Sequence, residues 1–528
     1  MTYVPVLIDG EWRDPINPAG TLQAVNPRTK ETLDPVYPVS SRYDVEAALV
    51  AAQAAVRDLR DLPPDRIAAF LEAYAANIEA RAEEICRLAD TETALGYAPR
   101  MRDVELPRTT DQLRQAATAA RDRSWVQATI DTATNIRSMF GPLAGPVVVF
   151  GPNNFPLAFN SVAGGDFAAA IAAGNPVIGK ANTGHPGTTK LLAEAALDAI
   201  HATGMPRALV QLIYRTPRDV GLTLVSHPLV GATGFTGSKA AGLKLKAAAD
   251  QAGKPIYLEM SSVNPVFVLP GVLRERGAEV AQELYASCAL GAGQFCTNPG
   301  LAVVLDSPES DAFIAAVEAL FAANPPQTLL GPGGPRDIDA AVERLTAGGA
   351  AVLTGGRPVD EPGYAYANTL LRVAGDRFVA APEVMQTEAF GTVNLIVVAK
   401  DVDQLVEIAA HMEGNLTGCL YSHSRGEDDA VYDQVAPVLR TKVGRLLNDK
   451  MPTGVAVVPS MNHGGPYPAT GHPGFTAVGI PAAMLRFGAL YCYDNVRPHR
   501  LPPELNDKNP TESMWRFIDR AWTQADVD

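Results

Sequence analysis

Between residues 146 and 270 the sequence alternates short apolar runs with Ala-rich stretches of helical composition. Strand, helix and strand repeated in this order are typical of parallel strands joined by right-handed crossovers, so the segment predicts a doubly wound α/β layer. Ligands of such a layer bind at the carboxyl ends of its strands. The expected strands cover 147–150, 176–178, 209–214, 230–235 and 256–258.

Other segments predict elements around this layer. A long amphipathic helix is expected over 65–90, and a second α/β region begins at 265 and runs to 480. Two further segments have strand composition but fit neither layer, and strands of this kind often pair across subunits. The tail, 501–528, is expected to pack on the surface. The additional strands are expected at 301–305 and 393–399 in the second region, and at 125–140 and 484–493 outside both layers.

Composition excludes several classes of protein. At about 100–200 residues per domain, 528 residues predict more than one domain. A net charge of −14 without any cluster of Lys and Arg argues against nucleic-acid binding. The five cysteines form no CxxC pair and the eight histidines no HxxxH or HxH pair, so we expect neither a disulfide framework nor a metal site. With no signal-like N-terminus and no run of about 18 apolar residues, a cytoplasmic protein that contacts no membrane is expected.

Three polar side chains stand at the ends of separate elements. Cys296 follows a glycine-rich turn, which lets backbone N–H groups approach whatever the sulfur attacks. Asn154 follows the apolar run 147–150, and Glu259 follows 256–258. Each residue has an ordinary structural reading when taken alone, because isolated cysteines are mostly buried small hydrophobes. Together they predict a hydrogen-bond donor, a base and a nucleophile.

Seven ordered motifs then make a resemblance specific. NNFPL, AAGNPVIGK, GFTGSKAAG, LEMSSVNP, GQFCTNPG and EAFGTV, with an Ala/Gly helix after the first, resemble the NAD(P)-dependent aldehyde dehydrogenase superfamily over nearly the whole chain. The variants EMSSVNP, GQFCTNPG, SVAGGD and PTGVAVVPSMNHGGPYPATG resemble its NADP-preferring branch, which contains 2-oxoglutarate semialdehyde (2,5-dioxovalerate) dehydrogenases and a fatty-aldehyde relative. Asn153 and Ser261-Ser262 depart from the wider superfamily's tryptophan and Gly-Gly pair.

The resemblance implies a fold and three catalytic roles. Cys296 would attack the aldehyde, the Asn154 amide and the Cys296 backbone N–H would hold the oxyanion, and Glu259 would activate the water that releases a carboxylate. A glutamate at 259 favours hydrolysis over acyl transfer to coenzyme A. The fold implied is a Rossmann-type cofactor domain, an α/β catalytic domain and a small β oligomerisation arm. The implied boundaries are 1–122 and 145–262 for the dinucleotide-binding domain, 263–480 for the catalytic domain, 123–144 and 481–500 for the arm, and 501–528 for the tail.

Residues that hold the dinucleotide are implied in the same way. A looser motif with Gly237, Ser238 and Gly242 replaces the usual GxGxxG, and Ser238 opens a helix whose free N–H groups would face a phosphate. Glu388 would hold the nicotinamide ribose, and Phe390 would line its pocket.

The adenosine end predicts the cofactor preference. Lys180 matches the lysine that reaches the adenosine ribose, and Thr183 stands where NAD-preferring relatives often have a glutamate. A carboxylate there would repel a 2′-phosphate, whereas a hydroxyl can donate to it. Arg218 could bind the same phosphate with two N–H groups. NADP is therefore expected as the preferred cofactor, with NAD possible.

The expected substrate is 2-oxoglutarate semialdehyde, oxidised to 2-oxoglutarate. Its remote carboxylate needs a polar partner, for which the motifs offer Arg108, Ser460, Asn462 and His463, the last equally suited to a structural hydrogen bond. The alternatives are a broad-specificity aliphatic (fatty) aldehyde dehydrogenase and, from another class, an inactive relative that binds dinucleotide. The family and the two stray strand segments imply a homodimer or homotetramer.

Overall fold

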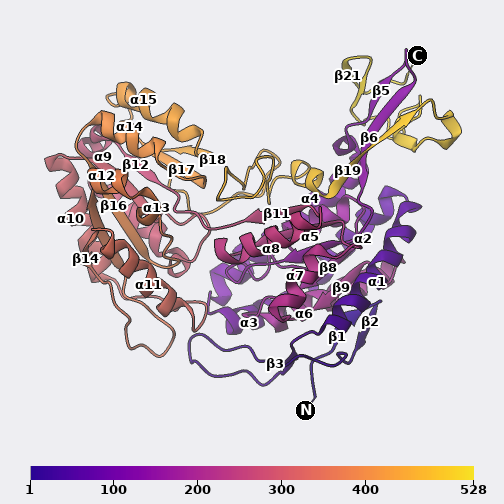
Figure 1. Cartoon of the computed structure of the whole chain (residues 1–528), viewed down its shortest axis with the longest axis horizontal. Helices are drawn as coiled ribbons and strands as arrows, with labels where there is room; N and C mark the ends of the chain where they lie inside the picture. Colours follow the sequence, from indigo (N-terminus) through magenta and orange to yellow (C-terminus); the bar gives the residue numbers. More distant parts are fainter. Residues whose placement is uncertain (1, 528) are drawn as a thin grey trace.

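The computed structural model describes residues 2–527 and contains two α/β lobes and a β arm that projects from the first lobe (Figure 1). The first lobe is built on a sheet with the order β11-β10-β7-β8-β9-β1-β2. The strands from β11 to β9 are parallel, as the sequence predicts, and β1 and β2 continue the sheet in antiparallel pairing. The strands are β1 (Val6–Ile8), β2 (Glu11–Arg13), β7 (Val147–Phe150), β8 (Val177–Lys180), β9 (Val210–Ile213), β10 (Ala232–Thr236) and β11 (Ile256–Glu259).

Helices rich in alanine cover this sheet, because small side chains let helix and sheet approach closely. The single helix expected over 65–90 is wrong: α2 ends at Ala80, α3 begins at Ala82, and Arg81 between them is not helical. Arg81 pairs with Glu194 on α6 (2.8 Å), and both helices pack on α6. The helices are α1 (Arg42–Arg60), α2 (Pro64–Ala80), α3 (Ala82–Thr93), α4 (Leu106–Asp122), α5 (Gly165–Ala172), α6 (Pro186–Thr203), α7 (Arg218–Ser226) and α8 (Lys239–Gln251).

The second lobe contains another sheet, with the order β14-β15-β16-β13-β12-β17-β18. All its pairs are parallel except β14 with β15. Its strands are β12 (Val266–Val268), β13 (Leu301–Leu305), β14 (Ala351–Thr354), β15 (Thr369–Ala374), β16 (Val393–Ala399), β17 (Asn415–Tyr421) and β18 (Val443–Asn448). Its helices are α9 (Pro270–Ala289), α10 (Pro308–Ala323), α11 (Gly334–Ala347), α12 (Gly375–Ala380), α13 (Pro382–Met385), α14 (Val402–Ala410) and α15 (Asp429–Arg440).

The arm is a third sheet, with the order β19-β6-β5-β20-β21. The segment expected as a strand at 125–140 forms two strands, and the one expected at 484–493 begins as a short 3-10 helix before β19. The tail contributes two strands that extend the arm sheet next to β5. The bounds are β5 (Thr129–Asp131), β6 (Ile136–Pro142), β19 (Gly488–Asp494), β20 (Arg516–Ile518) and β21 (Ala521–Thr523); a separate pair joins β3 (Thr21–Leu22) to β4 (Tyr37–Pro38).

Residues 449–481 form a long connecting segment that runs from the second lobe back to the arm (Figure 1). This segment pairs with the end of β11, because Met260 N–H donates to the Ala469 carbonyl (2.7 Å) and Gly471 N–H donates to the Leu258 carbonyl (3.2 Å). The connecting segment therefore lies against the carboxyl edge of the first sheet. Within residues 2–527 no helix combines the length and the apolarity needed to cross a membrane.

Candidate active site

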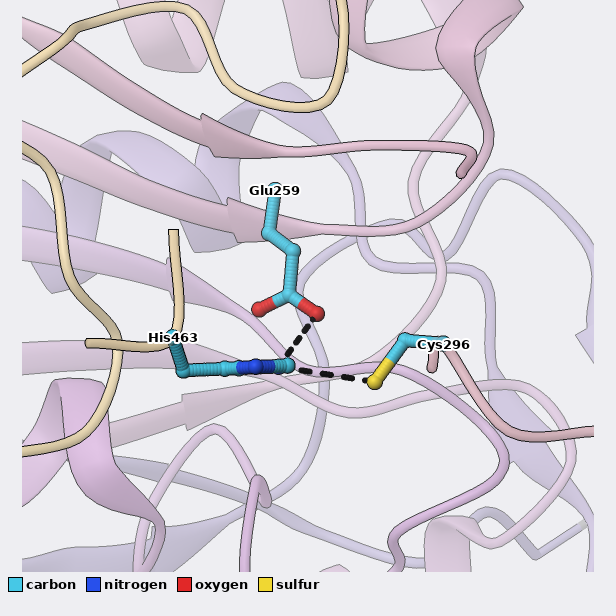
Figure 2. A group of neighbouring side chains, drawn as sticks. All are labelled: Glu259, Cys296 and His463. Atoms are coloured by element: carbon cyan, nitrogen blue, oxygen red, sulfur yellow. Dashed lines mark hydrogen bonds and ion pairs between the residues drawn. The ribbon is translucent and has the colours of Figure 1, made fainter. Parts of the chain in front are cut away.

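Three side chains from distant parts of the sequence meet where the connecting segment joins the lobes (Figure 2). Glu259 ends β11, Cys296 follows the 3-10 helix η3 (Leu290–Gly293), and His463 belongs to the connecting segment. Nε2 of His463 lies 3.4 Å from Sγ of Cys296 and 2.8 Å from Oε1 of Glu259. The structure thus combines a thiol, an imidazole nitrogen and a carboxylate in one cluster.

Glu259 is held at the carboxyl end of its strand by the pairing of its backbone with Thr470. Its side chain is only 1% exposed, and within residues 2–527 its Oε2 atom has no hydrogen-bond partner. A buried carboxylate oxygen without a donor is costly, and most such atoms in folded proteins are satisfied. The open Oε2 position is therefore suited to a ligand or a water molecule.

The turn before Cys296 requires glycine. Gly291 and Gly293 have φ values of 59° and 71°, and a Cβ atom at Gly293 would lie 2.1 Å from the Gly391 carbonyl group. On the other side, the Asn264 amide donates to the Cys296 carbonyl oxygen (2.9 Å). Burial, and then the Glu259 carboxylate, raise the pKa of the Cys296 thiol well above its ordinary value. The resting thiol is therefore protonated and needs a base before it can attack.

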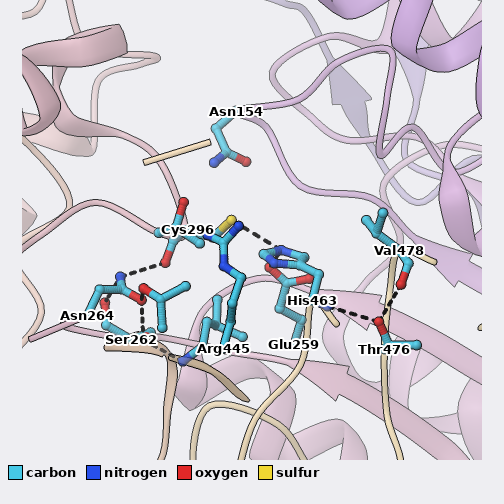
Figure 3. Close-up of polar contacts among 12 residues, drawn as sticks. Asn154, Glu259, Ser262, Asn264, Cys296, Arg445, His463, Thr476 and Val478 are labelled. Atoms are coloured by element: carbon cyan, nitrogen blue, oxygen red, sulfur yellow. Dashed lines mark hydrogen bonds and ion pairs between the residues drawn. The ribbon is translucent and has the colours of Figure 1, made fainter. Parts of the chain in front are cut away.

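Asn154 lies in the loop after β7 and is directed towards the turn that carries Cys296 (Figure 3). The side chain is buried, and its Nδ2 atom donates to the Gln294 carbonyl oxygen (2.9 Å). Because an amide nitrogen carries two hydrogens, one remains for a second acceptor. The structure thus brings the expected oxyanion donor to the expected nucleophile.

Arg108, near the start of α4, reaches an aromatic cluster beside this site. Its guanidinium carbon lies 5.3 Å and 5.1 Å from the ring centres of Phe155 and Phe159, and the Phe159 ring centre is 5.7 Å from that of His463. The Nε and Nη2 atoms of Arg108 are buried without a hydrogen-bond partner. In the part of the chain that the structure describes, no carboxylate forms an ion pair with this arginine.

Glu105 does not neutralise Arg108, because its carboxylate is already occupied. Its Oε2 pairs with Arg100 (3.1 Å), and its Oε1 accepts the N–H groups of Leu157 and Ala158. Loss of hydration lowers the pKa of the Arg108 guanidinium, although nearby negative groups oppose the shift. A desolvated and unpaired cation of this kind favours an anion supplied by a ligand.

The other three residues expected to contact the substrate do not lie together. Ser460 and Asn462 are exposed, and the Asn462 amide donates to the Gly444 carbonyl (3.2 Å), so neither joins the cluster. His463 is buried at its centre, which the sequence motif alone did not reveal. Sequence reasoning also missed Arg445, which is drawn beside the cysteine in Figure 3 and whose Nη2 donates to the carbonyls of Pro452 (3.0 Å) and Gly454 (3.1 Å).

A pocket adjoins the cysteine on the side of the second lobe. Its lining includes Ser262, Phe295 and Asn298 together with the expected ribose and nicotinamide residues Glu388 and Phe390. The Ser262 N–H donates to Oε1 of Glu388 (3.1 Å). Burial raises the pKa of the Glu388 carboxyl, and the hydrogen bonds from the serines oppose this rise.

The expected phosphate residues lie at the carboxyl edge of the first sheet. Ser238 caps α8 by accepting the N–H of Ala241, and the Lys239 N–H donates to the Ser261 hydroxyl (3.5 Å). Gly237 and Gly242 pack so tightly that added Cβ atoms would lie 2.9 Å from the Phe235 ring and 3.0 Å from the Met260 sulfur.

The expected adenosine residues follow neighbouring strands at the same edge. Lys180 ends β8 over the Phe150 ring, and burial, followed by Arg215, lowers the pKa of its ammonium group to about 8. Thr183 follows β8, and Arg218 opens α7 after β9. Both side chains are exposed at the ends of adjacent strands, so they are free to face one ligand.

Comparisons with known proteins identify the family of the chain. Residues 12–460 match the model of the aldehyde dehydrogenase family. The chain is 40% identical to alpha-ketoglutaric semialdehyde dehydrogenase 2 of Azospirillum brasilense, over 93% of this chain and 94% of that protein. It is 34% identical to alpha-ketoglutaric semialdehyde dehydrogenase of Acinetobacter baylyi, over 96% of each chain.

Solved structures share the fold at lower sequence identity. An aldehyde dehydrogenase of Pseudomonas syringae, crystallised with NAD+ and octanal, has a TM-score of 0.79 at 20% identity and covers 95% of this chain and 98% of its own. Gamma-glutamyl-gamma-aminobutyraldehyde dehydrogenase of Burkholderia cenocepacia has a TM-score of 0.78 at 22% identity, and the likeness covers 93% of this chain and 96% of that protein. At these identities the likeness concerns the fold.

Proposed function

The chain belongs to the aldehyde dehydrogenase family, and from that premise we propose that it oxidises 2-oxoglutarate semialdehyde to 2-oxoglutarate with NADP as the hydride acceptor. The two relatives at 40% and 34% identity, both alpha-ketoglutaric semialdehyde dehydrogenases, support the substrate. The observation that carries the proposal is the unpaired cation of Arg108, because this substrate has a carboxylate remote from its aldehyde.

The first chemical step is the attack of Cys296 on the aldehyde carbon. The protonated thiol must lose its proton, and the Glu259 carboxylate and the His463 ring are both within reach. The new C–S bond leaves negative charge on the aldehyde oxygen. The free hydrogen of the Asn154 amide and the backbone N–H of Cys296 stabilise this oxyanion, and loss of one such donor typically costs about 3 kcal/mol of barrier.

The residues present fit a dinucleotide. The pocket at Glu388 and Phe390 adjoins Cys296, and the capped first turn of α8 and the cation of Lys180 lie at the edge of the same sheet. When bound there, the dinucleotide would supply the acceptor for the hydride that leaves the thiohemiacetal carbon on Cys296, and a thioester would remain. Glu388 would orient the ribose, and the first turn of α8 would bind phosphate.

Hydrolysis of the thioester is assigned to Glu259. Its unpaired Oε2 can accept a proton from water, while Oε1 is held by His463. The water oxygen attacks the thioester carbon, and the C–S bond breaks to return the Cys296 thiol. A buried base beside the thioester supports hydrolysis rather than acyl transfer to coenzyme A.

The preference for NADP is proposed from two exposed residues. Thr183 offers a hydroxyl where a carboxylate would repel a 2′-phosphate, and Arg218 offers a guanidinium at the end of the next strand. Both side chains are free to move onto a ligand. Equal or better catalytic efficiency with NAD would overturn this part of the proposal alone.

We also propose that the arm joins two copies of the chain. Its strand β19 exposes Leu490 (63%), and the tail exposes Trp515 (48%) and Trp522 (56%). Large apolar side chains exposed on one small sheet favour association. A homodimer or a tetramer built from two dimers follows, and light scattering of the intact protein against a Leu490→Lys variant tests it.

A panel of aldehydes assayed with NADP and with NAD tests the function. We expect the highest kcat/KM for 2-oxoglutarate semialdehyde with NADP. If aliphatic aldehydes are better substrates by about tenfold or more, a difference of about 1.4 kcal/mol, the enzyme is a broad aliphatic aldehyde dehydrogenase. If no aldehyde is oxidised although dinucleotide binds, the chain is an inactive relative.

A further inference from the structure

The cluster of Cys296, His463 and Glu259 has the donor set of a zinc site, although no two of these residues are close in the sequence. We propose that one Zn²⁺ ion binds reversibly to these three side chains and thereby inhibits the enzyme. The site goes beyond the proposed oxidation, which needs no metal, and it uses a thiol, an imidazole and a carboxylate, all ordinary zinc ligands.

The distances suit coordination. A tetrahedral Zn²⁺, with bonds of about 2.3 Å to sulfur and about 2.0–2.2 Å to nitrogen and oxygen, keeps its ligand atoms about 3.4–3.6 Å apart. In the structure Sγ and Nε2 are 3.4 Å apart, Nε2 and Oε1 are 2.8 Å apart, and the three ligand atoms all lie within 4.8 Å. Coordination therefore requires side-chain rotations that shorten the distance from sulfur to the carboxylate oxygen and lengthen the distance from Nε2 to Oε1. The three side chains already point toward one another (Figure 2).

A second observation points to a cation. The Oε2 atom of Glu259 is buried and has no donor among the described residues, although Oε1 contacts Nε2 of His463. Zn²⁺ supplies a positive partner for this carboxylate. Binding releases the thiol proton of Cys296 to solvent, and neutral His463 coordinates through Nε2 with its proton on Nδ1. Thiolate and carboxylate together then balance the two charges of the ion, with no change of oxidation state.

Two arginines oppose a cation here. The Arg108 guanidinium lies over the Phe159 ring, and Arg445 lies on β18 with its guanidinium held by backbone carbonyls. The two guanidinium groups repel Zn²⁺ from a distance, whereas the three ligands bond to it directly. Because Cys296 is partly exposed, the ion can enter by the route that an aldehyde takes, and the fourth position stays open to water.

Inhibition follows from the ligands themselves. The sulfur lone pair that attacks the aldehyde and the carboxylate that activates water are both bound to the ion. Zn²⁺ and aldehyde therefore exclude each other, and a chelator restores activity.

Binding is tested without aldehyde or dinucleotide, so the result does not depend on the proposed substrate. Metal-free full-length protein is titrated with Zn²⁺ against a fluorescent chelator, and with Co²⁺ to detect a thiolate-to-metal charge-transfer band. We expect the unmodified protein to bind one ion per chain. In Cys296→Ser the charge-transfer band should be lost and binding should be at least about 100-fold weaker, a larger effect than replacing a residue that only hydrogen-bonds a metal ligand usually has. His463→Gln should weaken binding as well.

The matched control is Cys492→Ser, because Cys492 is an exposed thiol on the arm. This variant should bind the ion like the unmodified protein. Unchanged binding in Cys296→Ser with loss in Cys492→Ser, or no stoichiometric binding at all, would overturn the proposal. If Cys296→Ser does not fold, alkylation of the unmodified protein tests the site instead. Mass spectrometry should show that Zn²⁺ protects Cys296 from the alkylating reagent. Equal labelling of Cys296 with and without Zn²⁺ would contradict the site.

Discussion

The imidazole of His463 lies 2.8 Å from the carboxylate of Glu259, although 204 positions separate the two residues in the sequence. This contact joins the connecting segment to the end of β11 and leaves one carboxylate oxygen of Glu259 free for the reaction. It also makes the base of the proposed hydrolysis part of the same cluster as the nucleophile.

Replacement of Glu259 by glutamine should stop turnover after the thioester has formed. General bases contribute about 10²- to 10⁴-fold, and we expect steady-state turnover to fall by this amount. A burst of reduced cofactor, followed in a rapid-mixing absorbance experiment, should persist, because the glutamine leaves Cys296 and Asn154 in place. A linear time course without a burst would place Glu259 before the thioester instead.

Replacement of Asn154 by alanine should lower kcat by about 10²- to 10³-fold, because the oxyanion loses one of its two donors. The buried amide contacts the Gln294 carbonyl rather than the pocket at Glu388, so dinucleotide affinity should not change. Cofactor fluorescence measures that affinity, and steady-state kinetics measures kcat. A variant with normal kcat would show that the amide has only a structural role.

Replacement of Arg108 by glutamine should remove the anchor for the remote carboxylate. A hydrogen bond to a charged group contributes about 1.5–3 kcal/mol, so kcat/KM for 2-oxoglutarate semialdehyde should fall about 10- to 150-fold. Propanal, which has no carboxylate, should be oxidised about as before. Arg114→Gln is the control, because Arg114 lies on the same helix and pairs with Glu79 at the surface. Equal losses for both aldehydes would exclude the anchor.

Replacement of Thr183 by glutamate should select against NADP. The new carboxylate would repel the 2′-phosphate, so kcat/KM with NADP should fall at least about tenfold, while kcat/KM with NAD should hold or rise. Because Thr183 is exposed, the change should not affect folding. Arg218→Ala should lower the efficiency with NADP in the same direction. Parallel losses with both cofactors would contradict the assignment.

Binding of NADP should weaken as the pH rises through about 8, the pKa to which burial lowers the ammonium group of Lys180. An anionic ligand favours the protonated lysine, so above this pH the lysine must take up a proton when the ligand binds. The Kd should therefore increase with pH, with a slope that approaches about tenfold per pH unit. Cofactor fluorescence against pH measures the dependence. Lys180→Arg, which stays charged, should flatten it, and an equally steep profile in that variant would assign the titration to another group.

Local patterns in the sequence were sufficient for much of the fold. The apolar runs at 147–150 and 256–258 are strands of one parallel sheet, since alternating strands and helices restrict how a chain can pair. The helix expected over 65–90 is interrupted at Arg81, whose side chain pairs with Glu194 on another helix. Local pattern contains no information about such a partner.

The sequence by itself also predicted the roles of three residues, because Cys296, Glu259 and Asn154 each lie within a recognisable motif. Only the tertiary structure decided that His463 lies between Glu259 and Cys296, and that the guanidinium of Arg108 lies over Phe155 and Phe159 without a counterion among the described residues. The physical reason is that burial and pairing depend on which segments fold together. The connecting segment meets the edge of the first sheet through pairing with residues about 200 positions away, so no local spacing could reveal its histidine as part of the site.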